Sequence, residues 1–201
     1  MSDELKELLD EIEPKVTAKI VRLSEVQIER VTWMWKGYIP NNKLVLLEGN
    51  PGLGKSTLTC WIAAQVSNGN QFPCETKNEP KGVLFISAED GVADTIKPRV
   101  EAAGGNSASI YCVKGMEYQG VEGITDLSMR SHLDALKDQI VAHSVGLVII
   151  DPLMALIGES KDSHKDQAVR AITTPLAQLA EELQVTILAI RHLNKQGSSQ
   201  A

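Results

Sequence analysis

The sequence predicts an α/β protein with a mainly parallel five-stranded sheet and helices on both of its faces. Two observations support this fold class. Five short apolar runs alternate with four helical stretches, and a glycine-rich loop joins the first run to the first helix. Strands that are apolar throughout and alternate with amphipathic helices are typical of a parallel sheet covered on both sides.

The five predicted strands are rich in β-branched residues and too short for buried helices. They cover residues 44–47, 83–87, 110–113, 147–150 and 186–190. Each of the four predicted helices lies between two of these strands; Ser128 is a candidate cap for the third, and Pro175 should kink the last. The helices cover residues 55–68, 94–103, 128–142 and 166–183.

The composition bounds the class of protein. With 201 residues, 43% hydrophobic and 23% charged, the chain fits one globular domain with a short appendage. A net charge of −6 argues against general electrostatic attraction to nucleic acid. Three cysteines without a C-x-x-C pair argue against a zinc site or a disulfide framework. Because the N-terminus is acidic and no long apolar run follows, we expect a cytoplasmic protein without a membrane partner.

Three regions are expected along the chain. Residues 1–30 form an N-terminal arm, with a short acidic helix over residues 3–13 and a linker. Residues 31–195 form the α/β core, and residues 196–201 read as a flexible tail and a truncation point.

The loop after the first strand matches the phosphate-binding pattern G-x-x-x-x-G-K-[ST] in full. Glycines at this spacing let backbone N–H groups surround a phosphate at the N-terminus of the following helix. Lys55 can then reach the β- and γ-phosphates, and the Ser56 hydroxyl can ligate Mg²⁺. The alternative is a plain turn between strand and helix. The nucleotide-binding candidates are Gly49, Asn50, Pro51, Gly52, Leu53, Gly54, Lys55, Ser56 and Thr57.

Acidic residues end two further predicted strands. Asp151 follows the apolar run 147–150, which is the Walker B pattern, and could hold Mg²⁺ through water. Glu89 follows the strand 83–87 at the end where ligands bind, so it could orient and deprotonate an attacking water. Alternatively, Glu89 and Asp90 begin a polar loop; Asp90 is the weaker catalytic candidate.

Two other groups of residues have two interpretations each. His192, just past the run 186–190, could contact the γ-phosphate as a sensor, or it could be a structural histidine. Trp33, Trp35 and Tyr38 could stack on adenine, although packing against the sheet is the favoured interpretation.

With these motifs in place, the chain resembles the RecA-like P-loop ATPases. Within them it is most similar to the AAA ATPase branch around the plasmid hexameric helicase RepA and related proteins of phages and mobile elements. The matching segments are Gly49–Thr57, Ser87–Gly91, Pro98–Arg99, Ile149–Leu153, Asp166–Arg170 and Arg191–Lys195.

The resemblance implies a motor module that binds ATP with Mg²⁺ and hydrolyses it in DNA replication or recombination. It implies that Lys55 and Ser56 bind phosphate and metal, Asp151 serves Mg²⁺, Glu89 is the catalytic base and His192 is the sensor. It also implies a ring of subunits with ATP at their interfaces and single-stranded DNA as a partner. The family's arginine finger follows the sensor histidine, so we expect the finger beyond residue 201.

Two alternatives remain open at this level. A small-molecule kinase could use the same loop, but the sequence has no arginine cluster of the kind that forms a kinase lid. A regulatory nucleotide-binding module with slow hydrolysis would fit a missing finger, whereas Glu89 favours an active ATPase.

Overall fold

A computed structural model of the chain describes residues 18–73, 78–118, 121–123, 130–156 and 165–192. The chain divides into two units, residues 1–30 and residues 31–201. The described part of the first unit is exposed and contains one 3₁₀ turn at Leu23–Glu25. The predicted acidic helix over residues 3–13 lies outside the described residues.

The second unit contains the predicted sheet. Five strands pair in parallel in the order β3-β9-β8-β4-β5, which confirms the predicted fold class. β9 therefore lies between β3 and β8. The strands are β3 (Leu44–Gly49), β4 (Gly82–Ser87), β5 (Ile110–Val113), β8 (Val145–Asp151) and β9 (Thr186–His192).

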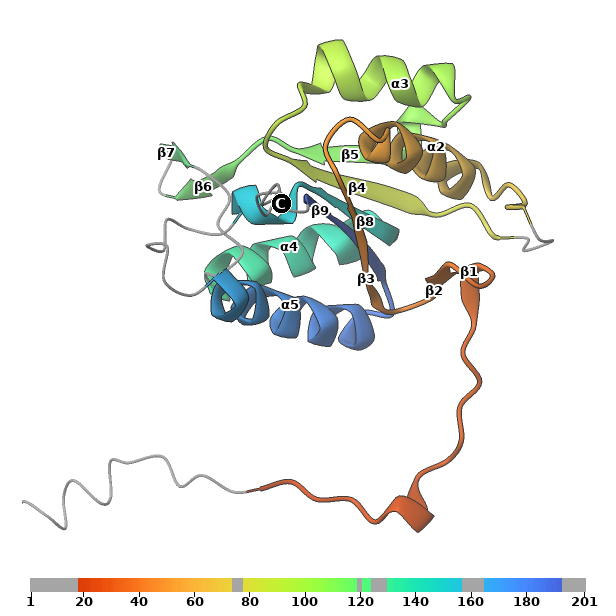
Figure 1. Cartoon of the computed structure of the whole chain (residues 1–201), viewed down its shortest axis with the longest axis vertical. Coiled ribbons are helices and arrows are strands. Elements are labelled where there is room, and N and C mark those ends of the chain that lie inside the picture. Colours follow the sequence, from red (N-terminus) through yellow and green to blue (C-terminus); the bar gives the residue numbers. More distant parts are fainter. Residues whose placement is uncertain (1–17, 74–77, 119–120, 124–129, 157–164, 193–201) are drawn as a thin grey trace, which may run out of the picture. The chain divides into compact units, whose positions relative to one another are not determined.

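Helices cover both faces of this sheet (Figure 1). Two of them, α2 (Lys55–Asn68) and α3 (Lys97–Ala102), lie over one face. The other two, α4 (Arg130–Ala142) and α5 (Lys165–Glu182), lie over the opposite face, and α5 continues through Pro175. No helix among the described residues is both long and apolar enough to cross a membrane.

The second predicted helix begins differently from the expectation. A π-helical turn spans Val92–Ile96, and the α-helix proper starts only at Lys97. The amide of Ile96 donates to the Gly91 carbonyl five residues earlier, at 3.0 Å, which widens this first turn. Such turns are rare and occur frequently at functional sites.

Alternate residues along each strand enter two separate hydrophobic clusters, as the pleat of a strand requires. Leu84 and Ile86 of β4 pack with α4 and α5, whereas Val83 and Phe85 pack with α2 and α3. All seven residues of β8 are buried. A sheet buried on both faces explains why its strands are apolar throughout.

Two short hairpins were not predicted from the sequence. β1 (Trp33–Trp35) pairs with β2 (Ile39–Pro40), and β6 (Met116–Tyr118) pairs with β7 (Val121–Gly123), both antiparallel. Strands of two or three residues are too short to show a period of their own.

Trp35 is the centre of an aromatic cluster on the α2 side of the sheet. Its ring lies 5.4 Å from that of Phe72 and 5.5 Å from that of Trp61, centroid to centroid. This geometry supports packing for Trp35, the favoured of the two interpretations. Tyr38, whose ring lies 4.9 Å from that of Trp35, remains 65% exposed.

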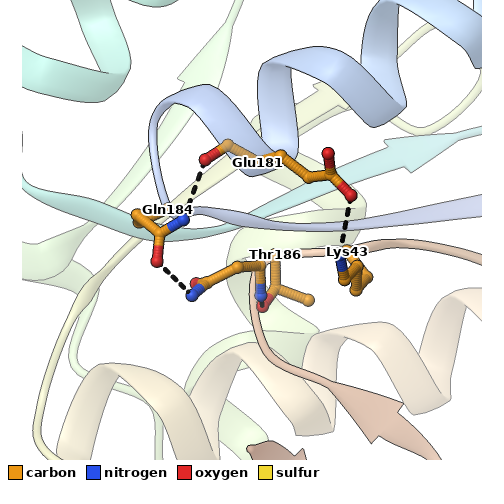
Figure 2. Close-up of polar contacts among 5 residues, drawn as sticks. Lys43, Glu181, Gln184 and Thr186 are labelled. Atoms are coloured by element: carbon orange, nitrogen blue, oxygen red, sulfur yellow. Dashed lines mark hydrogen bonds and ion pairs between the residues drawn. The ribbon is translucent and has the colours of Figure 1, made fainter. Parts of the chain in front are cut away.

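Polar contacts close the amino ends of β3 and β9 (Figure 2). Asn42 donates through its backbone amide to the Thr186 hydroxyl at 3.1 Å and through Nδ2 to Gln184 Oε1 at 2.7 Å. Gln184 Nε2 in turn donates to the Glu181 carbonyl at 2.8 Å, and Lys43 Nζ pairs with the Glu181 carboxylate at 2.6 Å. At this end of the sheet, these polar side chains thus find hydrogen-bond partners in one another and in the nearby backbone.

Candidate functional site

The predicted phosphate loop joins β3 to α2 at the carboxyl end of the sheet. Gly52 and Gly54 have φ angles of 80° and 76°, which favour glycine over any residue with a Cβ. A Cβ at either position would meet nothing within 4 Å, so backbone conformation alone demands glycine there. Gly54 caps α2, and its carbonyl accepts from the Leu58 amide at 2.9 Å.

The Lys55 side chain lies within the phosphate loop. The residue is only 7% exposed. Its Nζ donates to the carbonyls of Gly49 and Asn50, at 2.9 and 2.8 Å. The two loop carbonyls therefore hold the Lys55 ammonium group within the loop. A bound phosphate could replace these carbonyls as the acceptor.

Asp151 and Ser56 connect the loop to the predicted Walker B strand. Asp151 is the last residue of β8, is 7% exposed and accepts a hydrogen bond from the Ser56 side chain. Burial raises the pKa of the Asp151 carboxyl, and the nearby Asp90 and Glu89 carboxylates raise it further. The Ser56 hydrogen bond and His192 act in the opposite direction on this pKa. A buried carboxyl whose pKa is raised in this way would be stabilised in its ionised form by a cation.

His192 lies beside the start of the phosphate loop. In the parallel register of β3 and β9, His192 is paired with Gly49 and Arg191 with Glu48. His192 Nδ1 is buried and has no hydrogen-bond partner among the described residues. Arg191 Nη1 instead pairs with the Glu48 carboxylate at 3.2 Å. A buried ring nitrogen without a partner is unfavourable, and this one lies on the strand that pairs with the start of the phosphate loop.

The segment after β4 completes the candidate site. Ser87 is paired with Asp151 in the sheet register, and Glu89 follows as an exposed residue. The Glu89 side chain makes no hydrogen bond or ion pair to any described residue. A small pocket beside Ser56 is lined by Ser56, Thr59, Cys60, Phe85, Ser87, Asp90, Ile96 and Asp151.

The donor set fits a magnesium ion only in combination with a nucleotide. In the described part of the chain, no three histidine, cysteine or carboxylate side chains converge on a point that could hold a metal. Mg²⁺ is usually held by one or two protein oxygens together with substrate phosphates and water. The paired oxygens of Ser56 and Asp151 satisfy that requirement.

Sequence reasoning missed Cys60, which lines the pocket together with Asp90. Asp90, the weaker catalytic candidate, lines the pocket, whereas Glu89 does not. Cys60 stands one helical turn after Ser56 and is 3% exposed; burial raises the pKa of its thiol to about 11, so it stays protonated and unreactive. Cys60 could have been predicted as a pocket residue, because it lies four residues after Ser56 and so on the same helix face.

The parallel sheet, the glycine-rich loop and the acid-ended central strand define a RecA-like P-loop ATPase domain. A family model described as an AAA domain, AAA_25, matches residues 11–198. The chain therefore belongs to this AAA domain family. The narrower resemblance to the RepA branch stays a prediction.

Several relatives of the chain share the name DNA repair protein RadA. The chain is 25% identical to the DNA repair protein RadA of Streptococcus pneumoniae (strain ATCC BAA-255 / R6) over 185 residues, which is 92% of this chain and 38% of that protein. It is 26% identical to RadA of Chlamydia pneumoniae over 87% of this chain and 34% of that protein. It is 25% identical to RadA of Bacillus subtilis (strain 168) over 81% of this chain and 30% of that protein. The chain spans about a third of the length of these curated relatives.

Proposed function

We propose that this chain binds ATP with Mg²⁺ and hydrolyses the γ-phosphate, as the motor module of a protein of DNA repair, recombination or replication. The observation that carries the proposal is that Ser56 and Asp151 interact and line the same small pocket. This interaction joins the first turn of α2 to the end of β8, and it thereby places a hydroxyl and a carboxylate where a nucleotide-bound cation would lie.

Each residue has a definite part in the proposed reaction. The loop amides and Lys55 bind the β- and γ-phosphates, with Lys55 leaving its two carbonyl acceptors. Ser56 and Asp151 would hold Mg²⁺, which would supply positive charge to neutralise the transferred phosphoryl group. Glu89 accepts a proton from the attacking water, and His192 Nδ1 contacts the γ-phosphate. The exposure of Glu89 leaves room for a water molecule in front of its carboxylate.

The proposal is tested by following ADP and phosphate release from ATP and Mg²⁺ in the wild-type chain and in Glu89→Gln. The amide keeps the side-chain shape but cannot take a proton, so turnover should fall on the order of 10²-fold or more with ATP affinity retained. Glu101→Gln is the matched control, because Glu101 lies on α3 and pairs only with the exposed Lys97 among the described residues.

The alternatives give different products. A small-molecule kinase would transfer the phosphate to an acceptor in a substrate screen instead of to water. A regulatory module would bind ATP with almost no release of phosphate. Equal turnover in wild type and Glu89→Gln would place the general base elsewhere.

We further propose that the module acts in a ring and engages single-stranded DNA, with helicase-type motion as the output. The family, together with relatives that are named DNA repair proteins, supports a DNA-linked role. Light scattering with ATP and Mg²⁺, with and without single-stranded DNA, tests this. A larger species and faster turnover with DNA would support it, and a monomer indifferent to DNA would contradict it.

A further inference from the structure

The direction of the Glu89 carboxylate depends on the backbone around it. The side chain has no hydrogen bond or ion pair to a described residue, so within the described part of the chain its place is set by the backbone of residues 88 and 90. The Ala88 amide donates to the Asp151 carbonyl at 3.3 Å. The Asp90 amide donates to the Ser87 hydroxyl at 3.1 Å. The turn is therefore tied to β8 on one side of Glu89 and to the end of β4 on the other.

A third tie comes from α3. Arg99 Nη1 donates to Asp90 Oδ2 at 2.8 Å, and the two side chains are 39% and 28% exposed. An ion pair this exposed contributes little to global stability. Its consequence is geometric, because it fixes the residue next to Glu89 against α3, which follows the π-helical turn Val92–Ile96.

Arg99 also balances the charge of the site. Glu89, Asp90 and Asp151 gather at the carboxyl ends of two neighbouring strands. Burial raises the pKa of the Cys60 thiol most; Arg99 lowers it, and Asp90 and Asp151 raise it, so all three lie within electrostatic reach of the pocket. Without Arg99, Asp90 would repel the phosphates of an incoming nucleotide.

We propose that Arg99 is a positioning residue, which braces the turn carrying Glu89 through its ion pair with Asp90. This inference deepens the proposed function and rests on it. Arg99 does not touch the reacting atoms; it acts through Asp90 on the place of the Glu89 carboxylate. A misplacement of about 1 Å at a catalytic group can lower a rate on the order of 10²-fold.

The test compares Arg99→Ala, Asp90→Asn and the double variant with Lys97→Ala. Lys97 lies on the same helix in an ion pair with Glu101 of 3.8 Å, with side chains 61% and 55% exposed, so it controls for loss of a surface charge. Turnover is measured at saturating ATP and Mg²⁺, and ATP affinity by calorimetry. Arg99→Ala and Asp90→Asn should each lower kcat roughly tenfold to a hundredfold, with a smaller change in affinity. The double variant should be no slower than the worse single variant, because both remove one brace.

Amide hydrogen exchange at residues 88 and 90 gives a readout that does not need turnover. Exchange there should speed up in Arg99→Ala and stay unchanged in Lys97→Ala. Arg99→Lys, which keeps the charge without the planar fork, should recover only part of kcat. If Arg99→Ala has the wild-type kcat and unchanged amide exchange, the ion pair does not position the turn that carries Glu89. A wild-type chain that does not hydrolyse ATP would instead refute the proposed function, and exchange alone would then decide whether the brace exists.

Discussion

Polar groups at the two ends of the sheet differ in whether they have hydrogen-bond partners. At the amino end, the turns before β3, β8 and β9 hold the non-glycine residues Asn42, Ser144 and Gln184 at φ angles of 59°, 48° and 53°. Asn42 and Gln184 bond to each other, at 2.7 Å, and to their neighbours. The amino end also has left-handed glycines, Gly69 and Gly104, in the turns that follow α2 and α3. At the carboxyl end, Gly52 and Gly54 of the phosphate loop adopt this conformation, and His192 Nδ1 is buried without a described partner.

This difference distinguishes polar residues that stabilise the fold from polar residues that could bind a ligand. A backbone conformation that is costly for a side chain survives at the amino end because local hydrogen bonds compensate for it. In the phosphate loop at the carboxyl end the same conformation belongs to Gly52 and Gly54, where a Cβ would meet no atom within 4 Å, so these glycines are required by conformation and not by space. The buried carboxyl of Asp151 is an unfavourable feature for a chain that binds nothing there, and so is the His192 Nδ1 atom, which has no partner in the described part of the chain.

The largest expected effect is that of Lys55→Ala at the carboxyl end. ATP affinity by calorimetry should fall on the order of 100-fold, because a charge-assisted contact to the phosphates is lost. Since Lys55 is buried and bonded to two carbonyls, the variant should also lose about 1–3 kcal/mol of stability in urea unfolding. Unchanged affinity would break the assignment of the loop.

Asp151→Asn should stabilise the ligand-free chain while weakening Mg²⁺-dependent binding. The folded pKa of Asp151 is raised, so the folded state holds the proton more tightly than the unfolded state. Stability therefore falls as pH rises from the unfolded pKa, about 3.9, through the folded value, and the cost is fully present above it. The thermal midpoint of Asp151→Asn should exceed that of wild type at pH 7 by about 2–4 °C per kcal/mol of relief.

The pH dependence supplies the check on this prediction. The advantage of Asp151→Asn should shrink as pH is lowered below the folded pKa, because wild-type Asp151 is then neutral as well. An advantage that is independent of pH would show that ionisation of this carboxyl does not set the difference.

The smallest effect is expected at the amino end. Gln184→Ala removes bonds to Asn42 and the Glu181 carbonyl and leaves an alanine at positive φ, so stability should fall by about 1–2 kcal/mol. ATP affinity of the folded variant should match wild type. A nucleotide-binding defect in Gln184→Ala as large as that of Lys55→Ala would erase the distinction between the two ends.

The predictability of each feature follows from how local its cause is. The buried strands were predicted because a sheet covered on both faces requires apolar residues throughout, as in β8. The loop was predicted because its glycines and lysine are contiguous. The burial of Lys55 was not, since it depends on which way two carbonyls face. The Arg99–Asp90 pair was not either, because it forms only when α3 packs beside the end of β4.

The most direct test is amide hydrogen exchange of the wild-type chain with and without saturating ATP and Mg²⁺. Binding at the carboxyl end should slow exchange in residues 49–57 and 87–90, with no change in residues 42–44 and 184–186 at the amino end. Protection confined to the amino end, or no protection of residues 49–57, would contradict the placement of the nucleotide site at the carboxyl end of the sheet.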